Sequence, residues 1–257
     1  MNFAFLDQWE EFLPREAGHV ISLMGSGGKT SLMRILAERY AAWGIPAVLT
    51  TTTRSEPLMG IPGFTLEELP EPSLLPEILF LHAGLDPQGK WLGLDPAAVD
   101  DLGHRFPDRI ILAEVDGSAK KPIKLHHEDE PRWPSRTSLA LVVMGTAAVG
   151  SPAGRTLHRF GQVFWSPLAG LNEWTVWEWK HQLTLLLGPG GYLDRVPADV
   201  PAVLALTGLD EEQDSIGLFG FAGEAMEDQR LPLVMFCALG EEKPMIRTAW
   251  RDDGDSP

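Results

Sequence analysis

Residues 24–31 of the chain, Met-Gly-Ser-Gly-Gly-Lys-Thr-Ser, combine the residue types that bind phosphate. Glycines let backbone amides approach a phosphate chain, a lysine supplies a full positive charge, and the start of a following helix adds a partial one. The usual GxxxxGK(S/T) spacing would place its first glycine at position 23, which is leucine here. We interpret residues 25–31 as a shortened phosphate-binding loop. The alternative is a glycine-rich turn between a strand and a helix that binds no ligand.

Two carboxylates stand at the end of a strongly apolar stretch at residues 109–115, where Glu114 and Asp116 are two positions apart. Side chains at this spacing share one face of a strand. A carboxylate opposite a phosphate loop holds the Mg²⁺ that bridges the phosphates, and a second one can accept a proton from water or a hydroxyl group. We predict Thr30 and Asp116 as metal ligands and Glu114 as a candidate base. The alternative for Asp116 is that it only begins an Asp-Gly turn.

Four consecutive threonines, at positions 50–53, follow the apolar residues 47–49. Threonine is common in strands, so a structural role is one interpretation. The other is that these hydroxyls reach Mg²⁺ or the γ-phosphate, because open α/β sheets bind ligands at the carboxyl ends of their strands. The nucleotide-binding residues that we predict are Gly25, Ser26, Gly27, Gly28, Lys29, Thr30, Ser31, Thr51 and Thr52.

Further charged residues follow the acidic pair. Lys120, Lys121 and Lys124 either contact phosphate or an anionic substrate, or belong to a solvated loop. Residues 126–130, His-His-Glu-Asp-Glu, are metal-binding types, but adjacent ligands without helical spacing are weak grounds for a metal site. An arginine such as Arg159 can stabilise the charge of phosphoryl transfer. The catalytic residues that we predict are Lys29, Glu114, Asp116, Glu130 and Arg159.

The elements that must position these residues alternate along the chain. Apolar stretches predict strands at residues 19–23, 46–53, 77–82, 109–115, 138–144, 202–207 and 232–237, with a short return strand within 83–94. Helical spacing predicts helices at 5–13, 30–43, 96–106 and 172–187, and residues 54–76 and 145–167 read as loops. Alternating strands and helices favour parallel pairing with right-handed crossovers. We therefore predict an α/β fold: a P-loop NTPase-like, mostly parallel sheet flanked by helices in three layers.

Length and composition limit the domain organisation, the binding partners and the cellular compartment that the chain can have. We predict one nucleotide-binding domain over residues 1–240 and an acidic, flexible tail over 241–257. Lys and Arg number 21 against 36 Asp and Glu, and the resulting net charge of -15 repels nucleic acid and anionic membranes. Cys237 is the only cysteine, which excludes an intramolecular disulfide and fits a reducing compartment. With no recognisable leader and no apolar run of about 18 residues, we expect a cytoplasmic protein without membrane or nucleic-acid partners.

Taken together, these motifs resemble the YqeC family. The resemblance extends from about Val20 to Pro201, and it rests on the glycine loop, the threonines at 50–53, residues 114–118 with the lysines after them, Glu130-Pro131, Pro134 and His158-Arg159. Proteins of that family are described as accessory factors for selenium-dependent molybdenum hydroxylases, in maturation of a selenium-containing cofactor. The resemblance implies a P-loop fold, with nucleotide and magnesium at the glycine loop and the acidic strand end. It also implies a hydroxylase of that kind, or its cofactor precursor, as a partner.

Two departures from the expected patterns bear on the site. Asp129 stands where such proteins often carry a histidine before Glu-Pro, which weakens a catalytic or metal role at that position. Residues 207–210, Thr-Gly-Leu-Asp, stand where a guanine-reading Asn-Lys-x-Asp motif would follow the late strand, and they lack its asparagine. We therefore predict Mg²⁺ and ATP as the cofactors, in preference to GTP.

Three functions are consistent with these residues. The first is a Mg²⁺-dependent NTPase, or a phosphoryl or nucleotidyl transferase, that acts in cofactor maturation: Lys29 neutralises phosphate charge, Thr30 and Asp116 hold magnesium, and Glu114 or Glu130 is the base. The second is a non-catalytic module that delivers a cofactor under the control of nucleotide binding. The third is an ATP-dependent ligase, suggested because the short loop resembles that of Mur-type ligases, although no second substrate domain is evident in the sequence.

Overall fold

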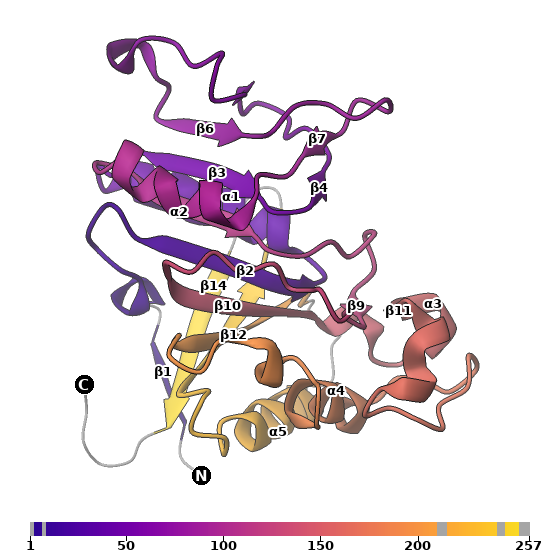
Figure 1. Ribbon diagram of the computed structural model, residues 1–257. Coiled ribbons are helices and arrows are strands. Elements are labelled where there is room, and N and C mark those ends of the chain that lie inside the picture. The colour runs from indigo at the N-terminus through magenta and orange to yellow at the C-terminus, as the bar shows by residue number, and fades with distance from the viewer. Residues whose placement is uncertain (1–2, 7–8, 210–214, 241–244, 252–257) are drawn as a thin grey trace.

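The protein is built on a ten-stranded sheet, shown in the computed structural model of Figure 1. The structure describes residues 3–6, 9–209, 215–240 and 245–251. Within these residues the strands follow one another across the sheet in the order β1-β14-β13-β12-β10-β2-β8-β3-β6-β5. In that order they span Phe3–Leu6, Met245–Arg251, Leu233–Ala238, Ala202–Thr207, Thr137–Gly145, Val20–Ser26, Ile110–Glu114, Ala47–Thr51, Ile78–Leu81 and Gly63–Phe64.

Most of the sheet is parallel, as predicted. Each neighbouring pair from β13 to β5 is parallel, whereas β14 is antiparallel to both β13 and β1. The strands β2, β3, β8 and β12 are buried along their whole length, which is typical of a parallel sheet covered on both faces. Because β2 pairs with β8, and β8 with β3, the glycine loop, the carboxylates and the threonines all lie at one edge of the sheet.

One face of the sheet is covered by α1 (Lys29–Ala42). Its buried Leu32 and Leu36 pack in one apolar cluster with Ile21 of β2 and Leu141 of β10. The helix begins directly after the glycine loop, so its N-terminus is fixed at the carboxyl end of β2. This is the strand, loop and helix arrangement that the sequence predicts.

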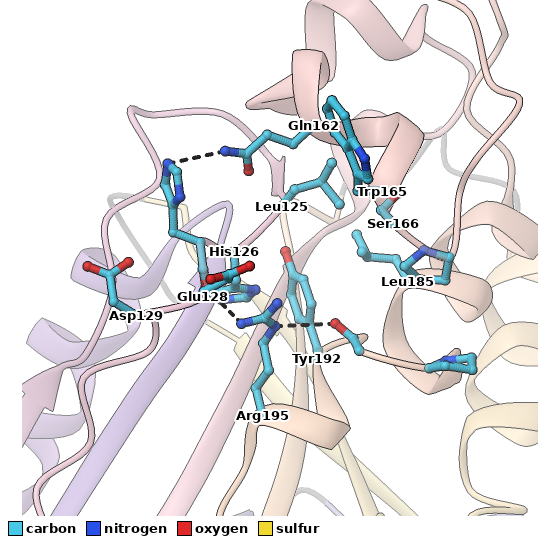
Figure 2. A pocket seen from close by; sticks show the side chains of 14 residues that line it. Leu125, His126, Glu128, Asp129, Gln162, Trp165, Ser166, Leu185, Tyr192 and Arg195 are labelled. Carbon is cyan, nitrogen blue, oxygen red and sulfur yellow. Dashed lines mark hydrogen bonds between the residues drawn. The ribbon is translucent and has the colours of Figure 1, made fainter.

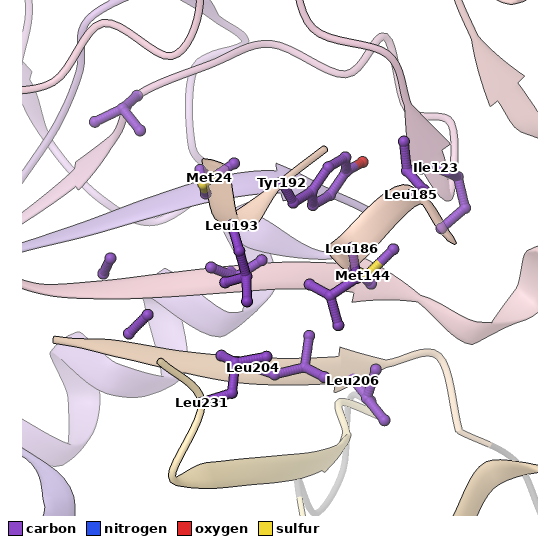
Figure 3. Packing of buried hydrophobic residues seen from close by; sticks show 14 of the residues in the cluster. Met24, Ile123, Met144, Leu185, Leu186, Tyr192, Leu193, Leu204, Leu206 and Leu231 are labelled. Atoms are coloured by element: carbon purple, nitrogen blue, oxygen red, sulfur yellow. The ribbon is translucent and has the colours of Figure 1, made fainter. Parts of the chain in front are cut away.

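The opposite face is covered by α2 (Pro96–Arg105), α4 (Trp179–Leu187) and α5 (Ser215–Ala225). Figure 3 shows part of this second core, where Leu185 and Leu186 of α4 lie over Met144 and Leu206 of the sheet. α4 and α5 lie side by side in Figure 1. Helices on both faces confirm the predicted three-layer α/β fold.

Shorter elements complete the described chain. Two small pairs of strands lie outside the main sheet: β4 with β7, and β9 with β11. They span Arg54–Ser55, Trp91–Leu92, Ile123–Lys124 and Leu157–His158. The helix α3 covers Ala153–Thr156, and the 3-10 helices η1 to η5 cover Trp9–Phe12, Pro72–Leu74, Thr146–Ala148, Phe160–Trp165 and Leu193–Arg195. The predicted loop at 145–167 is thus a series of short turns of helix, with β11 among them.

Two predicted helices differ from the structure, and two elements, α5 and β14, were not predicted. The amphipathic helix at 5–13 is replaced by β1 and η1. The helix at 172–187 begins only at Trp179. Before it, the N–H of Thr175 closes a single turn on the carbonyl of Asn172, and the N–H of Trp177 bonds to the carbonyl of Ser151 in another segment. α5 was not predicted. The tail predicted over 241–257 contains β14, and its remaining residues lie outside the described ones.

Candidate functional site

The glycine loop requires glycine for both conformation and space. Gly25, Gly27 and Gly28 have φ values of 98°, 89° and 133°, which L side chains rarely adopt. The loop also lies against β10. A Cβ atom at Gly25 would be 2.1 Å from the carbonyl oxygen of Val143, and one at Gly27 would be 2.5 Å from Cα of Gly145. The shortened loop is therefore built closely onto the sheet.

A cavity of about 590 Å³, which we call the loop cavity, lies beside the glycine loop. Among its lining residues are Glu114 and five of the predicted nucleotide-binding residues, Gly27, Gly28, Lys29, Thr30 and Ser31. Arg54, Lys90 and Lys120 also line it, against the single further carboxylate of Glu56. The N-terminus of α1 opens on the cavity and adds a partial positive charge. The loop cavity therefore suits an anion.

Two predicted loop residues do not line the loop cavity. The backbone N–H of Gly25 donates to Asp116 Oδ2 over 2.8 Å, and Ser26 Oγ donates to the carbonyl oxygen of Pro122 over 3.1 Å. Both residues fasten the loop to the segment that follows β8. Their contribution to the site is to hold the loop, whereas Gly27 and the loop residues after it line the cavity.

Lys29 is buried beside the loop cavity. Its Nζ donates to the carbonyl oxygen of Gly25 over 2.5 Å and lies 3.0 Å from Asp116 Oδ1. That carboxylate oxygen accepts no well-aligned hydrogen bond from the described residues, so charge rather than hydrogen bonding joins it to Lys29. An ammonium group has three hydrogens. Lys29 can thus donate to a phosphate oxygen while it keeps its bond to the loop.

Thr30 and Glu114 contact one another where they line the loop cavity. Thr30 Oγ1 donates to Glu114 Oε1 over 2.5 Å, and Glu114 is the last residue of β8. Burial raises the pKa of the Glu114 carboxyl, while Lys29 and Thr30 act in the opposite direction. Hydroxyl and carboxylate oxygens are the ligand types that Mg²⁺ prefers. The structure therefore places Glu114 beside Thr30, in the position predicted for Asp116.

Asp116 lies behind the glycine loop, fully buried and outside the lining of the loop cavity. Besides its contacts with Gly25 and Lys29, its Oδ2 lies 2.6 Å from His126 Nε2 and 3.3 Å from Lys124 Nζ. Burial opposes ionisation, but Lys29, His126 and Lys124 outweigh it and hold the pKa of Asp116 well below its usual range. We therefore correct its predicted role: Asp116 joins the loop to the chain behind it and does not present an oxygen to a metal in the cavity.

The buried ion pairs continue from Asp116 to Glu130 and Arg159. The Lys124 side chain is wholly buried, and its Nζ donates to Glu130 Oε2 over 2.8 Å and to the carbonyl oxygen of Gly117 over 2.7 Å. Arg159 donates two parallel bonds to Glu130, of 2.6 and 2.8 Å. Burial opposes ionisation of Glu130, but Arg159 and Lys124 lower its pKa to about 2.

The contacts of Glu130 and Arg159 bear on the catalytic roles predicted for them. A carboxylate that is ionised down to pH 2 is a poor proton acceptor at neutral pH, so Glu130 does not suit a general base. Arg159 is engaged by Glu130, and neither residue lines the loop cavity. Their contribution in this structure is to close the ion-pair network.

Thr51 and Thr52 are buried, and their hydroxyl groups face the main chain. Thr51 Oγ1 donates to the carbonyl oxygen of Glu114 over 3.1 Å, and Thr52 Oγ1 donates to that of Arg132 over 3.0 Å. Neither residue lines the loop cavity. The structural interpretation of the threonines fits these contacts, and the ligand-binding interpretation does not.

Three residues of the network were not identified from the sequence. Lys124 was one of three lysines with no sign of burial, and His126 stood in a stretch considered only for metal. Tyr192, far along the chain, both donates to the Lys124 carbonyl over 3.0 Å and accepts from its N–H over 3.1 Å. Its ring packs edge-on against His126, with centroids 4.8 Å apart. A single sequence carries no signal that pairs these positions.

Two negative findings apply to the residues that the structure describes. No group of three or more His, Cys, Asp or Glu side chains is arranged to hold a metal ion among them, including at positions 126–130. A Mg²⁺ ion at Thr30 and Glu114 would not need such a group, because phosphate and water oxygens complete its shell. No helix in the same residues is long and apolar enough to cross a bilayer.

Comparison with known proteins gives two matches. The family model described as "YqeC protein" matches residues 21–161, which contain the glycine loop, the carboxylates and the ion-pair network up to Arg159. A protein of Escherichia coli (strain K12), recorded as "Uncharacterized protein YqeC", is 34% identical to this chain over 184 residues, which are 69% of this chain and 71% of that protein. No solved structure gives a significant match.

Proposed function

This chain belongs to the YqeC family, and from the geometry of its loop cavity we propose that it is a Mg²⁺-dependent nucleotide-binding protein that hydrolyses ATP or transfers a phosphoryl or nucleotidyl group. One observation carries the proposal. The loop cavity is lined by the glycine loop, by Lys29 and Thr30 at the start of α1, and by Glu114 at the end of β8, which contacts Thr30. These groups supply the backbone donors, the positive charge and the hard oxygen ligands that a triphosphate with Mg²⁺ requires.

The roles of individual residues follow from their contacts. Gly27 and Gly28 supply backbone amides for the phosphates, and Lys29 can donate to a phosphate oxygen while it keeps its bond to Gly25. Thr30 and Glu114 would hold Mg²⁺, either directly or through its water molecules. Magnesium neutralises charge that builds up on the phosphates during transfer. Glu114 also contacts Thr30 in the cavity wall, so of the two predicted bases, Glu114 and Glu130, we assign the role to Glu114.

A second candidate, a nucleotide-gated binding module without turnover, is favoured by one observation. The carboxylates of Asp116 and Glu130 are both neutralised by buried cations, which leaves Glu114 to serve as metal ligand and base together. Binding without hydrolysis would then be the outcome. The preference for ATP over GTP stays a prediction, because Asp210 lies outside the described residues.

The biological role in this proposal comes from the family resemblance. We place the nucleotide-dependent step in maturation of a selenium- and molybdenum-containing hydroxylase, acting on the hydroxylase or on its cofactor precursor. The test is to incubate the precursor enzyme with a reduced selenium donor, Mg²⁺, ATP and the pure protein, and to measure the selenium content and hydroxylase activity gained. An equal gain without the protein would contradict this role and leave the nucleotide proposal standing.

The nucleotide proposal is tested by calorimetric titration of AMP-PNP into the protein with and without Mg²⁺. We expect binding that weakens by at least about tenfold in Lys29→Ala, since a charge-assisted contact to phosphate is lost. The matched control is Lys180→Ala, a lysine that is 69% exposed on α4 and outside the loop cavity. Glu114→Gln should remove the gain in affinity that Mg²⁺ gives. Phosphate release from ATP then separates the enzyme from the binding module, and equal affinity in the two lysine variants would refute both.

A further inference from the structure

A second cavity, of about 650 Å³, lies next to His126, and we call it the His126 pocket. Figure 2 shows His126 and Tyr192 in its interior, with Gln162 and Trp165 of η4 above them. The segment that carries Glu128 and Asp129 forms the facing side. Leu185 of α4 and the turn before Tyr192 close it. The pocket is therefore built by segments that come together only in the folded chain.

One buried carboxylate, Asp116, lies between the His126 pocket and the loop cavity and contacts a lining residue of each. Asp116 Oδ1 lies 3.0 Å from Lys29 Nζ, which lines the loop cavity, and Asp116 Oδ2 lies 2.6 Å from His126 Nε2, which lines the second pocket. The His126 side chain is only 1% exposed, and its ring is held edge-on by Tyr192. A change in the ion pair between Lys29 and Asp116 must therefore affect the contact of Asp116 with His126, whose ring has little freedom to move.

The walls of the His126 pocket differ in charge from those of the loop cavity. Glu128 and Asp129 are exposed at the pocket and form no ion pair with any residue that the structure describes. Arg195 is the cation of the lining, and its Nη1 already donates to the carbonyl oxygens of His127 and Glu130. The loop cavity has four cationic side chains against two carboxylates. An anion is thus favoured in the loop cavity and disfavoured in the His126 pocket.

The His126 pocket also has an apolar and aromatic side. The Trp165 indole is 82% exposed at the cavity, and Leu185 and Pro189 line it as well. An exposed tryptophan beside a cavity gives a flat surface on which a ring can stack, and it attracts a cation over its face. Apolar walls with a few polar groups are the usual composition of a small-molecule site.

We propose that the His126 pocket binds the second ligand of the protein, an organic molecule with an aromatic or apolar part and an amine, and that its occupancy is coupled through Asp116 to nucleotide in the loop cavity. The proposal rests on the proposed nucleotide binding for the coupling, but not for the pocket itself. The amine would lie toward Glu128 and Asp129, and the ring against Trp165. When Lys29 turns to a phosphate, Asp116 loses part of its positive surroundings and binds His126 more strongly, which is the link between the sites.

Tyramine and phenylacetate are suitable probes, because both carry a benzene ring and they differ in the sign of their charge. We expect calorimetric titration to give measurable binding of tyramine and not of phenylacetate. Trp165→Ala should weaken tyramine about five- to tenfold, as loss of an aromatic contact implies. The matched control is Trp174→Ala, which removes a tryptophan that is 73% exposed and lies outside the pocket. Both side chains are at the surface, so neither variant should fail to fold.

Three outcomes would overturn the assignment of the pocket: tighter binding of phenylacetate, no binding of either probe, or an equal effect of the two tryptophan variants. The coupling is measured by repeating the tyramine titration with saturating Mg²⁺ and AMP-PNP. We expect a change of about fivefold or more in affinity, the lower end of typical couplings between sites. An unchanged affinity would refute the coupling. The two proposals can fail separately. If wild type does not bind AMP-PNP but Lys29→Ala still binds tyramine, the nucleotide proposal is refuted and the assignment of the His126 pocket stands.

Discussion

The clearest test of the buried ion-pair network is Glu130→Gln. The Glu130 side chain is 13% exposed and bonds to Lys124 and to both terminal nitrogens of Arg159. These cations lower its pKa from an ordinary 4.5 to about 2. One pKa unit corresponds to about 1.4 kcal/mol, so the charge of Glu130 should contribute about 3 kcal/mol to the free energy of unfolding at pH 7. Breaking a buried pair by removing one partner costs a similar amount, about 3–5 kcal/mol.

The same shift fixes the sign of the pH dependence. Because the folded-state pKa of Glu130 is lowered, its stabilisation is complete above the unfolded-state pKa of 4.5 and is lost as the pH falls toward 2. The difference in free energy of unfolding between wild type and Glu130→Gln should therefore be about 3 kcal/mol at pH 6 and about 2 kcal/mol at pH 3.5. Below that pH it should continue to shrink.

Urea unfolding followed by tryptophan fluorescence at several pH values measures this difference. The control is Glu38→Gln, which removes the acidic partner of Arg34 in an exposed pair on α1. Exposed pairs of this kind contribute about 0.3–0.5 kcal/mol, so its unfolding curve should nearly overlay that of wild type. A Glu130→Gln effect as small as the control's, or one that grows as the pH falls, would refute the reasoning.

Two further variants test the loop and the network. Gly27→Ala should abolish AMP-PNP binding and lower the melting temperature, because the new Cβ would lie 2.5 Å from Gly145 Cα. The control is Gly44→Ala, where the glycine also has a positive φ but a Cβ would meet no atom within 4 Å. Equal effects of the two variants in thermal melts and titrations would show that steric clash at the loop does not matter. Lys124→Met should cost about 3–5 kcal/mol in urea unfolding, because Asp116 and Glu130 both lose a buried partner. The same change at the exposed Lys180 should cost little, and an unaltered Lys124→Met midpoint would contradict the network.

Local patterns in the sequence were enough to predict the framework. The strand predicted at 202–207 matches β12, and the helices predicted at 30–43 and 96–106 match α1 and α2 to within one residue. The glycine loop was found for the same reason, since residue type and spacing within a few positions define it. α5 was missed because its glycines lower helix propensity, and its stability comes from packing against α4.

Partners far apart in the sequence were not predictable. Thr30 bonds to Glu114 across 84 positions, and nothing local distinguished Glu114 from Asp116 as the group that faces the cavity. The residues of β14 show only weak alternation of apolar and polar types, so this segment was assigned to a tail. Its structure is decided by its pairing with β13 and β1. Lys124 was considered for phosphate contact or for a solvated loop, and His126 for a metal site. The folded chain instead buries both around Asp116.

The measurement that tests the central claim most directly is a crystal structure of the protein with Mg²⁺ and AMP-PNP. The account predicts phosphate oxygens within hydrogen-bonding distance of the Gly27 and Gly28 amides and of Lys29 Nζ. It also predicts Mg²⁺ next to Thr30 and Glu114, with Asp116 still bonded to His126. Phosphates bound outside the loop cavity, or Mg²⁺ coordinated by Asp116 in place of Glu114, would contradict it.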